Sequence, residues 1–458
     1  MLLLIGVKRQ ISSASSAWTR IGESEGLVAN ACLGTGSDVI NDFDSIYPWS
    51  DIISYNYNTS TDKITAYYGD INFRYDGSNG EVLTYIPEFY YKRFQEDGWE
   101  YIYISKYAKT GYLKSEEFSV GRYLTSEDAE GNLKVASNKN VSTGKKINEY
   151  RGLIKSSLGD EFCMYDTRHF TLQALYLVEY ADYDSQKVLG NGNTNYMAST
   201  TILNGATIPN SYALYDSAGQ DGKNTIIIPI SNGTEFNHIG MEIYVSTGYL
   251  EPYDEIPRTV KSFEPYYENG TLAGYKVVFD GPAVNLFAGV HGLQPAPQST
   301  GGCDALGMKS GYIGANGYSS VSYRGIEDIF GNAYVFLDGI NIKNNRPYIC
   351  TNPELYASDV FSGAYAELSY TSDTSGVEYN AVTLGCDEKF PLIAVPNITR
   401  PNSTSIPDSA FGTATGNSII QVNGTINSYS AAGLFNTIHL GSSDLSSNYS
   451  TCRIIRYK

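Results

Sequence analysis

The chain has few basic residues. Its 32 Lys and Arg stand against 49 Asp and Glu, which gives a formal net charge of −17 at pH 7. The basic residues form no run longer than a short pair, so the electrostatic attraction that draws proteins to a phosphate backbone is missing. We therefore expect no nucleic-acid partner.

Long hydrophobic runs are missing as well. The N-terminal stretch MLLLIGVKRQ has only a few apolar residues before Lys8 and Arg9, which is too short for the apolar region of a secretion signal. Nowhere do about 18 apolar residues follow one another, as a membrane-spanning helix requires. We therefore expect neither a secretion signal nor membrane insertion.

Cysteine and histidine are scarce and scattered. No C-x-x-C or H-E-x-x-H spacing occurs, so the sequence indicates neither a zinc site nor a disulfide framework. We expect the cysteines to be reduced and mostly buried: Cys32, Cys163, Cys303, Cys350, Cys386 and Cys452. The histidines stand alone in the sequence: His169, His238, His291 and His439. A lone histidine is more often a polar core or surface residue than a metal ligand.

Glycine and tyrosine are abundant, with 45 and 40 residues against three Trp and five Met. Together with 42% apolar and 18% charged residues, this composition is typical of a loop-rich β protein with a sizeable core. Tyrosine suits both strands and surfaces that recognise partners, and the strand interpretation accounts for most of the tyrosines. A chain of 458 residues has room for two or three domains.

Local patterns predict mainly strands. Asp97-Gly98 separates two β-rich runs, which predicts a hairpin, and Asn269-Gly270 is a similar turn in a second β-rich region. Residues 111–150 are polar and rich in Gly, Ser, Asn and Lys, which predicts a long surface loop or crossover. One helix is predicted over residues 167–182, and no second helix is evident.

The stretch SYRGIEDIFGNAYVFLDGINI, residues 322–342, combines turn residues with an apolar tail. Gly331 and Gly339 permit positive φ, and Asn332 can bond its own backbone. Side chains then alternate as in a strand buried on one face, Ala333, Val335 and Leu337 against Tyr334, Phe336 and Asp338. The stretch is therefore predicted to be scaffold and not catalyst.

These residues also carry a resemblance. YRGIEDIFGNAYVFLDGINI resembles the Arg-Gly…Gly-Asn-Val-Trp-Glu-Trp core of the formylglycine-generating-enzyme type of C-type lectin fold, with Tyr334, Val335 and Phe336 in place of Trp, Glu and Trp. The helix ending in LVEYAD and the final GLFNTIHLGSSDLSSNYSTCRIIRYK are similar to that family's helix and closing strands. Over roughly residues 80–458, the order of the motifs resembles phage tail proteins whose C-terminal C-type lectin domain displays a host-binding surface, a group that includes targets of diversity-generating retroelements.

The resemblance implies an α+β, mostly β chain with a C-type lectin-like fold, long loops and one main helix. Residues 1–80 would form an N-terminal β region for particle attachment or oligomerisation, and residues 81–150 a β-hairpin and polar connector. Residues 151–458 would form the C-type lectin-like domain, with a β-rich insertion at about 200–285. The implied protein is a structural component of the virion, made in the host cytoplasm. Its implied partners are other phage tail proteins, a host-surface glycan or protein, and further copies of itself in a homotrimer.

The resemblance also suggests candidate ligand-binding residues near the C-terminus. Between residues 427 and 450 polar and aromatic side chains alternate with an apolar frame that includes Phe435, and a recognition surface needs such a frame. In the relatives diversified by retroelements, the variable region lies just before the closing strand. By that resemblance the candidates are Tyr429, Asn436, His439, Ser443, Asp444, Asn448 and Tyr449. The alternative is a solvated polar loop without a partner.

Two alternatives concern chemistry. A metal-dependent oxidase of the formylglycine-generating type needs a close cysteine pair, and the nearest comparable residues here, Cys350 and Cys386, are far apart in sequence. We therefore expect no enzyme and no cofactor. Bound Ca²⁺ stays open, because carboxylates cluster near the core stretch, although they lack the spacing of an EF-hand loop and turn capping is preferred: Asp304, Glu327, Asp328 and Asp338.

Overall fold

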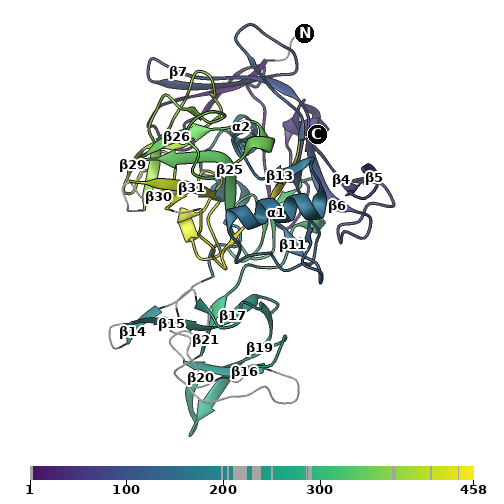
Figure 1. Cartoon of the computed structure of the whole chain (residues 1–458), viewed down its shortest axis with the longest axis vertical. Coiled ribbons are helices and arrows are strands. Elements are labelled where there is room, and N and C mark those ends of the chain that lie inside the picture. The colour runs from purple at the N-terminus through teal and green to yellow at the C-terminus, as the bar shows by residue number, and fades with distance from the viewer. Residues whose placement is uncertain are drawn as a thin grey trace. The chain divides into compact units, whose positions relative to one another are not determined.

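The computed structural model describes residues 4–196, 200–203, 206–209, 224–229, 239–248, 251–284, 286, 291–373, 378–412, 415–441 and 443–457. The chain forms two compact units: Met1–Thr194 with Thr300–Lys458 make unit 1, and Asn195–Ser299 make unit 2. Strands predominate over helices (Figure 1), so the predicted α+β, mostly β class is confirmed. No helix among these residues is long and apolar enough to cross a membrane.

Unit 1 begins with a five-stranded sheet in the order β2-β1-β8-β7-β9. Its strands are β1 (Leu4–Gln10), β2 (Thr19–Gly22), β7 (Phe89–Glu96), β8 (Trp99–Ser105) and β9 (Leu113–Ser115). Between β7 and β8, Asp97 and Gly98 have φ angles of 52° and 78°, the left-handed values that a two-residue hairpin turn favours. The predicted hairpin is confirmed.

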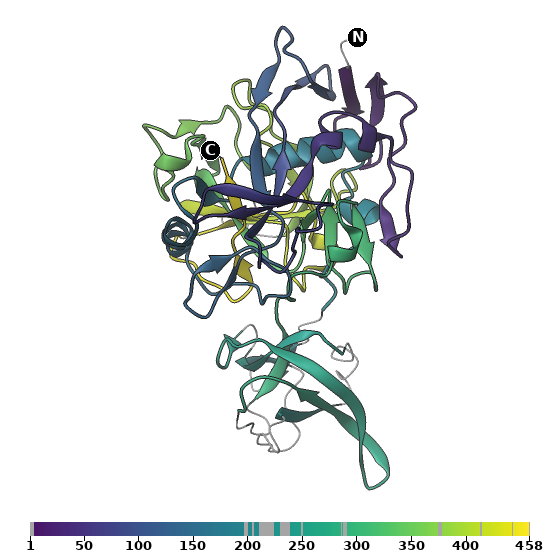
Figure 2. The same cartoon turned by 90° about the vertical axis from the view of Figure 1, so that its right-hand side faces the viewer.

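A six-stranded sheet follows in the order β13-β34-β10-β6-β4-β5. Its strands are β4 (Ile53–Asn58), β5 (Lys63–Tyr67), β6 (Glu81–Ile86), β10 (Phe118–Gly121), β13 (Phe162–Met164) and β34 (Ile454–Arg456). The last described strand, β34, lies between β10 and β13, so the first and the last described strands, β1 and β34, both belong to unit 1 (Figure 2).

The boundaries between the regions predicted in unit 1 do not coincide with breaks in the structure. β1 pairs with β8, and β4 pairs with β6, so residues 1–80 share two sheets with the residues that follow them. The prediction of a surface loop over 111–150 is wrong for residues 118–126, which are buried. β10 supplies a central strand there, because Phe118 and Val120 alternate as a buried strand requires.

The second half of unit 1 contains a nine-stranded sheet, and this sheet includes the strands of the segment 427–450. Its strands are β25 (Tyr334–Lys343), β26 (Arg346–Ile349), β27 (Ala366–Glu367), β28 (Tyr379–Leu384), β29 (Pro396–Arg400), β30 (Ser409–Gly412), β31 (Asn417–Val422), β32 (Thr437–Leu440) and β33 (Ser450–Thr451). A four-stranded sheet contains β3 (Cys32–Gly34), β22 (Gly311–Ile313), β23 (Val321–Tyr323) and β24 (Ile326–Glu327). A short pair joins β11 (Ser126–Glu127) to β12 (Leu133–Lys134).

Three α-helices occur in the described chain: α1 (Ile147–Leu158), α2 (Arg168–Tyr180) and α3 (Ser185–Leu189). α2 confirms the predicted helix, and every residue after Arg168 is buried in it. α1, which packs on β13 (Figure 1), was not predicted. Its buried residues have helical spacing, but the boundary drawn at residue 150 divided them: Ile147, Tyr150, Ile154 and Leu158.

A buried ion pair connects α2 to the Arg-Gly motif. Arg324 donates to both carboxylate oxygens of Glu179, at 2.7 and 2.9 Å, and the Glu179 side chain is fully buried. Tyr323 and Asn41 donate to the same carboxylate at 3.0 and 2.7 Å. Because both charges are paired and hydrogen-bonded, the ion pair fixes α2 relative to the Arg-Gly motif at Arg324.

The core strand β25 differs from the prediction of a strand buried on one face. Phe336 and Asp338 are as fully buried as Val335 and Leu337, because core side chains cover both sides of the strand. Asp338 is stabilised by two hydrogen bonds from Arg151 of α1. Only the two ends of the strand reach solvent: Tyr334 is partly exposed and Lys343 is exposed.

Unit 2 is built from strands in its described part, and it includes the predicted β-rich insertion at 200–285. Its strands are β14 (Thr200–Leu203), β15 (Ala206–Pro209), β16 (Asn224–Pro229), β17 (Glu242–Gly248), β18 (Glu251–Pro252), β19 (Arg258–Glu268), β20 (Thr271–Phe279) and β21 (Gly292–Pro295). Asn269 and Gly270 join β19 to β20 with φ angles of 49° and 79°, which confirms the second predicted turn.

Candidate binding site

Three of the seven predicted ligand-binding residues have buried side chains. Asn436, His439 and Tyr449 are 1%, 1% and 4% exposed, so the prediction that they face a ligand is wrong. His439 lies on β32, which is paired on both sides by β30 and β31. Asn436 donates to the carbonyl oxygens of Ser409 and Ala431 at 3.1 and 3.0 Å. These polar side chains are therefore buried within unit 1, on or next to the strands of the nine-stranded sheet.

The other four predicted residues reach the surface. Tyr429 is 40% exposed, Asp444 is exposed, and Ser443 and Asn448 are partly exposed. They come from two loops: the first carries the short 3-10 helix η6 (Tyr429–Ala431), and the second connects β32 to β33. In the second loop, the Asp444 carboxylate forms an ion pair with Lys146 at 3.3 Å.

Tyr334 brings these two loops together. Its backbone N–H donates to the carbonyl oxygen of Tyr449 at 2.9 Å, at the end of the second loop. Its hydroxyl lies 3.3 Å from the hydroxyl of Ser428, next to Tyr429 in the first loop. We call Tyr334 and the four exposed or partly exposed candidates of these two loops the loop surface: Tyr334, Tyr429, Ser443, Asp444 and Asn448. Tyr334 itself was not predicted as a binding residue, and only its place at the exposed end of the core strand could have indicated it.

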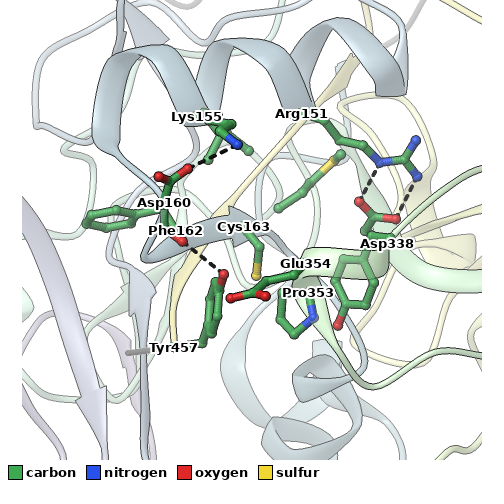
Figure 3. A pocket seen from close by; sticks show the side chains of 12 residues that line it. Arg151, Lys155, Asp160, Phe162, Cys163, Asp338, Pro353, Glu354 and Tyr457 are labelled. Atoms are coloured by element: carbon green, nitrogen blue, oxygen red, sulfur yellow. Dashed lines mark hydrogen bonds and ion pairs between the residues drawn. The ribbon is translucent and has the colours of Figure 1, made fainter. Parts of the chain in front are cut away.

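The structure also contains a cavity that the sequence did not indicate. It has a volume of about 510 Å³ and lies beside α1 (Figure 3). Arg151 and Lys155 border it from the helix, and Pro353 and Glu354 border it from the 3-10 helix η5 (Pro353–Leu355). Tyr457 forms another part of its wall and donates to the backbone oxygen of Asp160 at 2.9 Å.

Most charges around this cavity are paired. Arg151 donates two hydrogen bonds to Asp338, at 2.7 and 2.8 Å, and Lys155 lies 3.2 Å from Asp160 (Figure 3). Burial by itself would lower the pKa of Arg151, but Asp338 outweighs it and raises the pKa above the usual value. The paired charges leave a polar rim that suits a ligand of low net charge.

None of the six cysteines is activated as a nucleophile. Burial raises the pKa of every thiol above its ordinary value, and all six are free: Cys32, Cys163, Cys303, Cys350, Cys386 and Cys452. Five are buried, and Cys386 is partly exposed. A thiol must lose its proton to attack a substrate or bind copper, so these residues favour a structural role.

The histidines are likewise separate core residues where the structure describes them. Burial lowers the pKa of His169 and of His439 to about 3, and it also lowers the pKa of His291. His169 has ring partners, with Tyr165 at 3.2 Å and Gln173 at 2.9 Å. His238 lies outside the described residues.

The carboxylates considered for Ca²⁺ already have protein partners. Asp338 binds Arg151, and Asp304 accepts hydrogen bonds from the hydroxyls of Tyr123 and Ser137. Glu327 accepts two backbone N–H groups at 2.6 and 2.7 Å, and burial together with Asp328 raises its pKa above the usual value. Over the described residues, no three His, Cys, Asp or Glu side chains are grouped so as to hold a metal ion.

Comparison with known proteins adds no family assignment. No protein-family model matches the chain, and no curated protein matches it.

Proposed function

We propose that the chain is a structural protein of a bacteriophage tail that recognises the host surface through the loop surface of a C-type lectin-like domain. The observation that carries the proposal is the position of Tyr334. It stands at the exposed end of a buried strand and contacts both loops that hold the remaining exposed candidates.

The support beneath these loops is rigid. β25 is buried on both sides, and the loop between β31 and β32 is anchored by Phe435, whose side chain is 1% exposed. Loops on such a scaffold can change their outward side chains with little effect on the core, which suits recognition of a variable partner.

The loop surface offers the contacts that recognition needs. Tyr429 supplies a large ring with a hydroxyl, while Ser443, Asp444 and Asn448 supply hydrogen-bond donors and acceptors. Aromatic anchors commonly contribute much of the energy of an interface. The proposal includes other tail proteins and further copies of the chain, as a homotrimer, among the partners, and the virion as its location. It assigns the chain no enzymatic activity.

The first test locates the chain on the particle. Antibodies raised against the full chain are bound to purified phage particles from the strain whose DNA encodes the sequence, and the complexes are viewed by electron microscopy. We expect the antibodies, detected with a gold label, to bind at the tail tip. We also expect them to inhibit adsorption of the phage to host cells. Absence of the chain from purified particles by mass spectrometry contradicts the proposal.

A further inference from the structure

A second cavity, of about 730 Å³, lies over one face of the six-stranded sheet. Side chains of paired residues in neighbouring strands point to the same side of a sheet. On this face Tyr55 of β4 pairs with Tyr67 of β5. Tyr85 of β6 pairs with Ile53 on one side and with Ser119 on the other. Ser119 pairs in turn with Arg456. The cavity is thus floored by a row of tyrosine rings that ends at a guanidinium group.

Hydrogen bonds hold two of these rings, those of Tyr55 and Tyr85, in place. The hydroxyl of Tyr55 donates to Ser119 at 2.7 Å, and the hydroxyl of Tyr85 donates to Glu117. The guanidinium of Arg456 lies 4.3 Å from the ring centre of Tyr57 beneath it. Because the rings are fixed before any ligand arrives, a flat ligand can stack on them at little cost in side-chain entropy.

This cavity and the one in Figure 3 have a common wall. Tyr457 lines both, and the Arg168 guanidinium lies 5.7 Å from the Tyr457 ring and 5.8 Å from the Phe118 ring. We call the second cavity, with its wall at Tyr457, the aromatic groove, formed chiefly by Tyr55, Tyr67, Tyr85, Phe118, Arg456 and Tyr457. The two cavities therefore adjoin at Tyr457.

The charges that line the groove disfavour two classes of ligand, anionic polymers and purely apolar molecules. In the second cavity two exposed carboxylates, Asp51 and Glu117, outnumber the single guanidinium of Arg456. Arg456 also lies 3.7 Å from Asp62 and 4.0 Å from Glu161. With a net charge of −17 on the whole chain, an anionic polymer is repelled. Carboxylates and tyrosine hydroxyls on the lining are also unsuited to a purely apolar ligand.

We propose that the aromatic groove binds a neutral saccharide chain. A pyranose ring has an apolar face of C–H groups that stacks on a tyrosine ring and a rim of hydroxyls that donate to carboxylates. The groove presents both kinds of contact: the rings of Tyr67 and Tyr85 line the cavity, and the carboxylate of Glu117 lies beside Tyr85. The inference goes beyond the proposed function, because the groove and the loop surface have no residue in common.

The test uses the purified full chain on an array of neutral oligosaccharides, with glucose, mannose and N-acetylglucosamine oligomers as probes and poly(glycerol phosphate) as the anionic probe. We expect binding to a neutral oligomer. Tyr67→Ala removes a ring that is 44% exposed and should weaken this binding about tenfold, whereas Tyr67→Phe keeps the ring and the affinity. Glu117→Gln should weaken binding as well.

The matched control is Tyr107→Ala, because Tyr107 is 50% exposed and lines neither cavity. It should bind like the unmodified chain, and so should Tyr429→Ala, which alters only the loop surface. Equal melting temperatures show that each variant is folded. The proposal is overturned if no neutral oligomer binds, if poly(glycerol phosphate) binds more tightly, or if Tyr67→Ala binds as well as Tyr107→Ala.

Discussion

The segment from Asn427 to Ser450 consists of two parts that look alike in sequence and differ in the structure. Residues 434–440 point their polar side chains into the nine-stranded sheet, whereas the flanking loops expose Tyr429 and Asp444. Asn occurs in both parts, as Asn436 and as Asn448, so polarity alone does not separate a recognition surface from a polar interior. Strand pairing separates them, because β32 has a neighbour on each side.

The largest expected effect is on the inward part. Phe435 is 1% exposed, and its ring centre lies 4.8 Å from that of Tyr183. Phe435→Ala should lower the free energy of unfolding by about 3–5 kcal/mol, because it leaves a cavity in the core. Urea unfolding followed by circular dichroism measures the change. A loss below about 1 kcal/mol would show that this part is not anchored in the core.

Tyr449→Ala should also destabilise the fold, by about 3 kcal/mol, because this side chain is 4% exposed. If the side chain of Tyr449 were instead exposed on a surface loop, the substitution would leave the free energy of unfolding almost unchanged. Thermal melting of Tyr449→Ala beside Tyr429→Ala compares the two tyrosines directly. Equal melting temperatures would remove the distinction between inward and outward residues.

His439→Leu should stabilise the protein. Both ring nitrogens of His439 are buried without a hydrogen-bonding partner among the described atoms, so an apolar side chain should raise the free energy of unfolding by about 1–2 kcal/mol at pH 7. Burial lowers the pKa of His439 to about 3, so below pH 6.5 only the unfolded chain gains the proton. Protonation therefore stabilises the unfolded chain as the pH falls, and at pH 5 the advantage of the variant should be larger by about 2 kcal/mol than at pH 7.

Urea unfolding at pH 7 and pH 5 checks this expectation, with His169→Leu as the control. His169 is as deeply buried and has a similarly lowered pKa, but it has ring partners in Tyr165 and Gln173. Its replacement should bring no gain at pH 7, because those partners are left without their hydrogen bonds. A loss of stability in His439→Leu at both pH values would contradict the account.

The smallest effect on folding is expected in the outward part. Tyr429→Ala and Asp444→Asn should each change the free energy of unfolding by less than about 0.5 kcal/mol, since both side chains are exposed. The ion pair of Asp444 with Lys146 is solvent-exposed and adds little. Differential scanning calorimetry compares the melting temperature of each variant with that of the unmodified chain. A melting temperature lowered by many degrees would show that these side chains stabilise the fold.

Local signals predicted part of the fold. Asp97-Gly98 and the apolar spacing of α2 depend on neighbouring residues alone, and both predictions are confirmed. α1 is not predicted by the sequence, because the polar composition of residues 111–150 masks the helical spacing that begins at Ile147 and Tyr150. The C-type lectin-like fold stays a prediction.

The candidate site was predictable only in its outward loops. The burial of His439 results from pairing with β30 and β31, whose residues come earlier in the chain and give no local signal at position 439. The aromatic groove was out of reach for the same reason, since it joins residues near positions 55, 85, 118 and 456. Contacts between distant segments define both features.

The most direct test of the central claim is adsorption of the fluorescently labelled full chain to cells of the host strain. The double variant Tyr429→Ala, Asp444→Asn should bind at least about tenfold less while melting at the temperature of the unmodified chain, because its changed side chains meet the host and not the core. Tyr107→Ala, exposed to a similar degree outside the loop surface, should bind and melt normally. Normal adsorption of the double variant would contradict the assignment of host recognition to the loop surface.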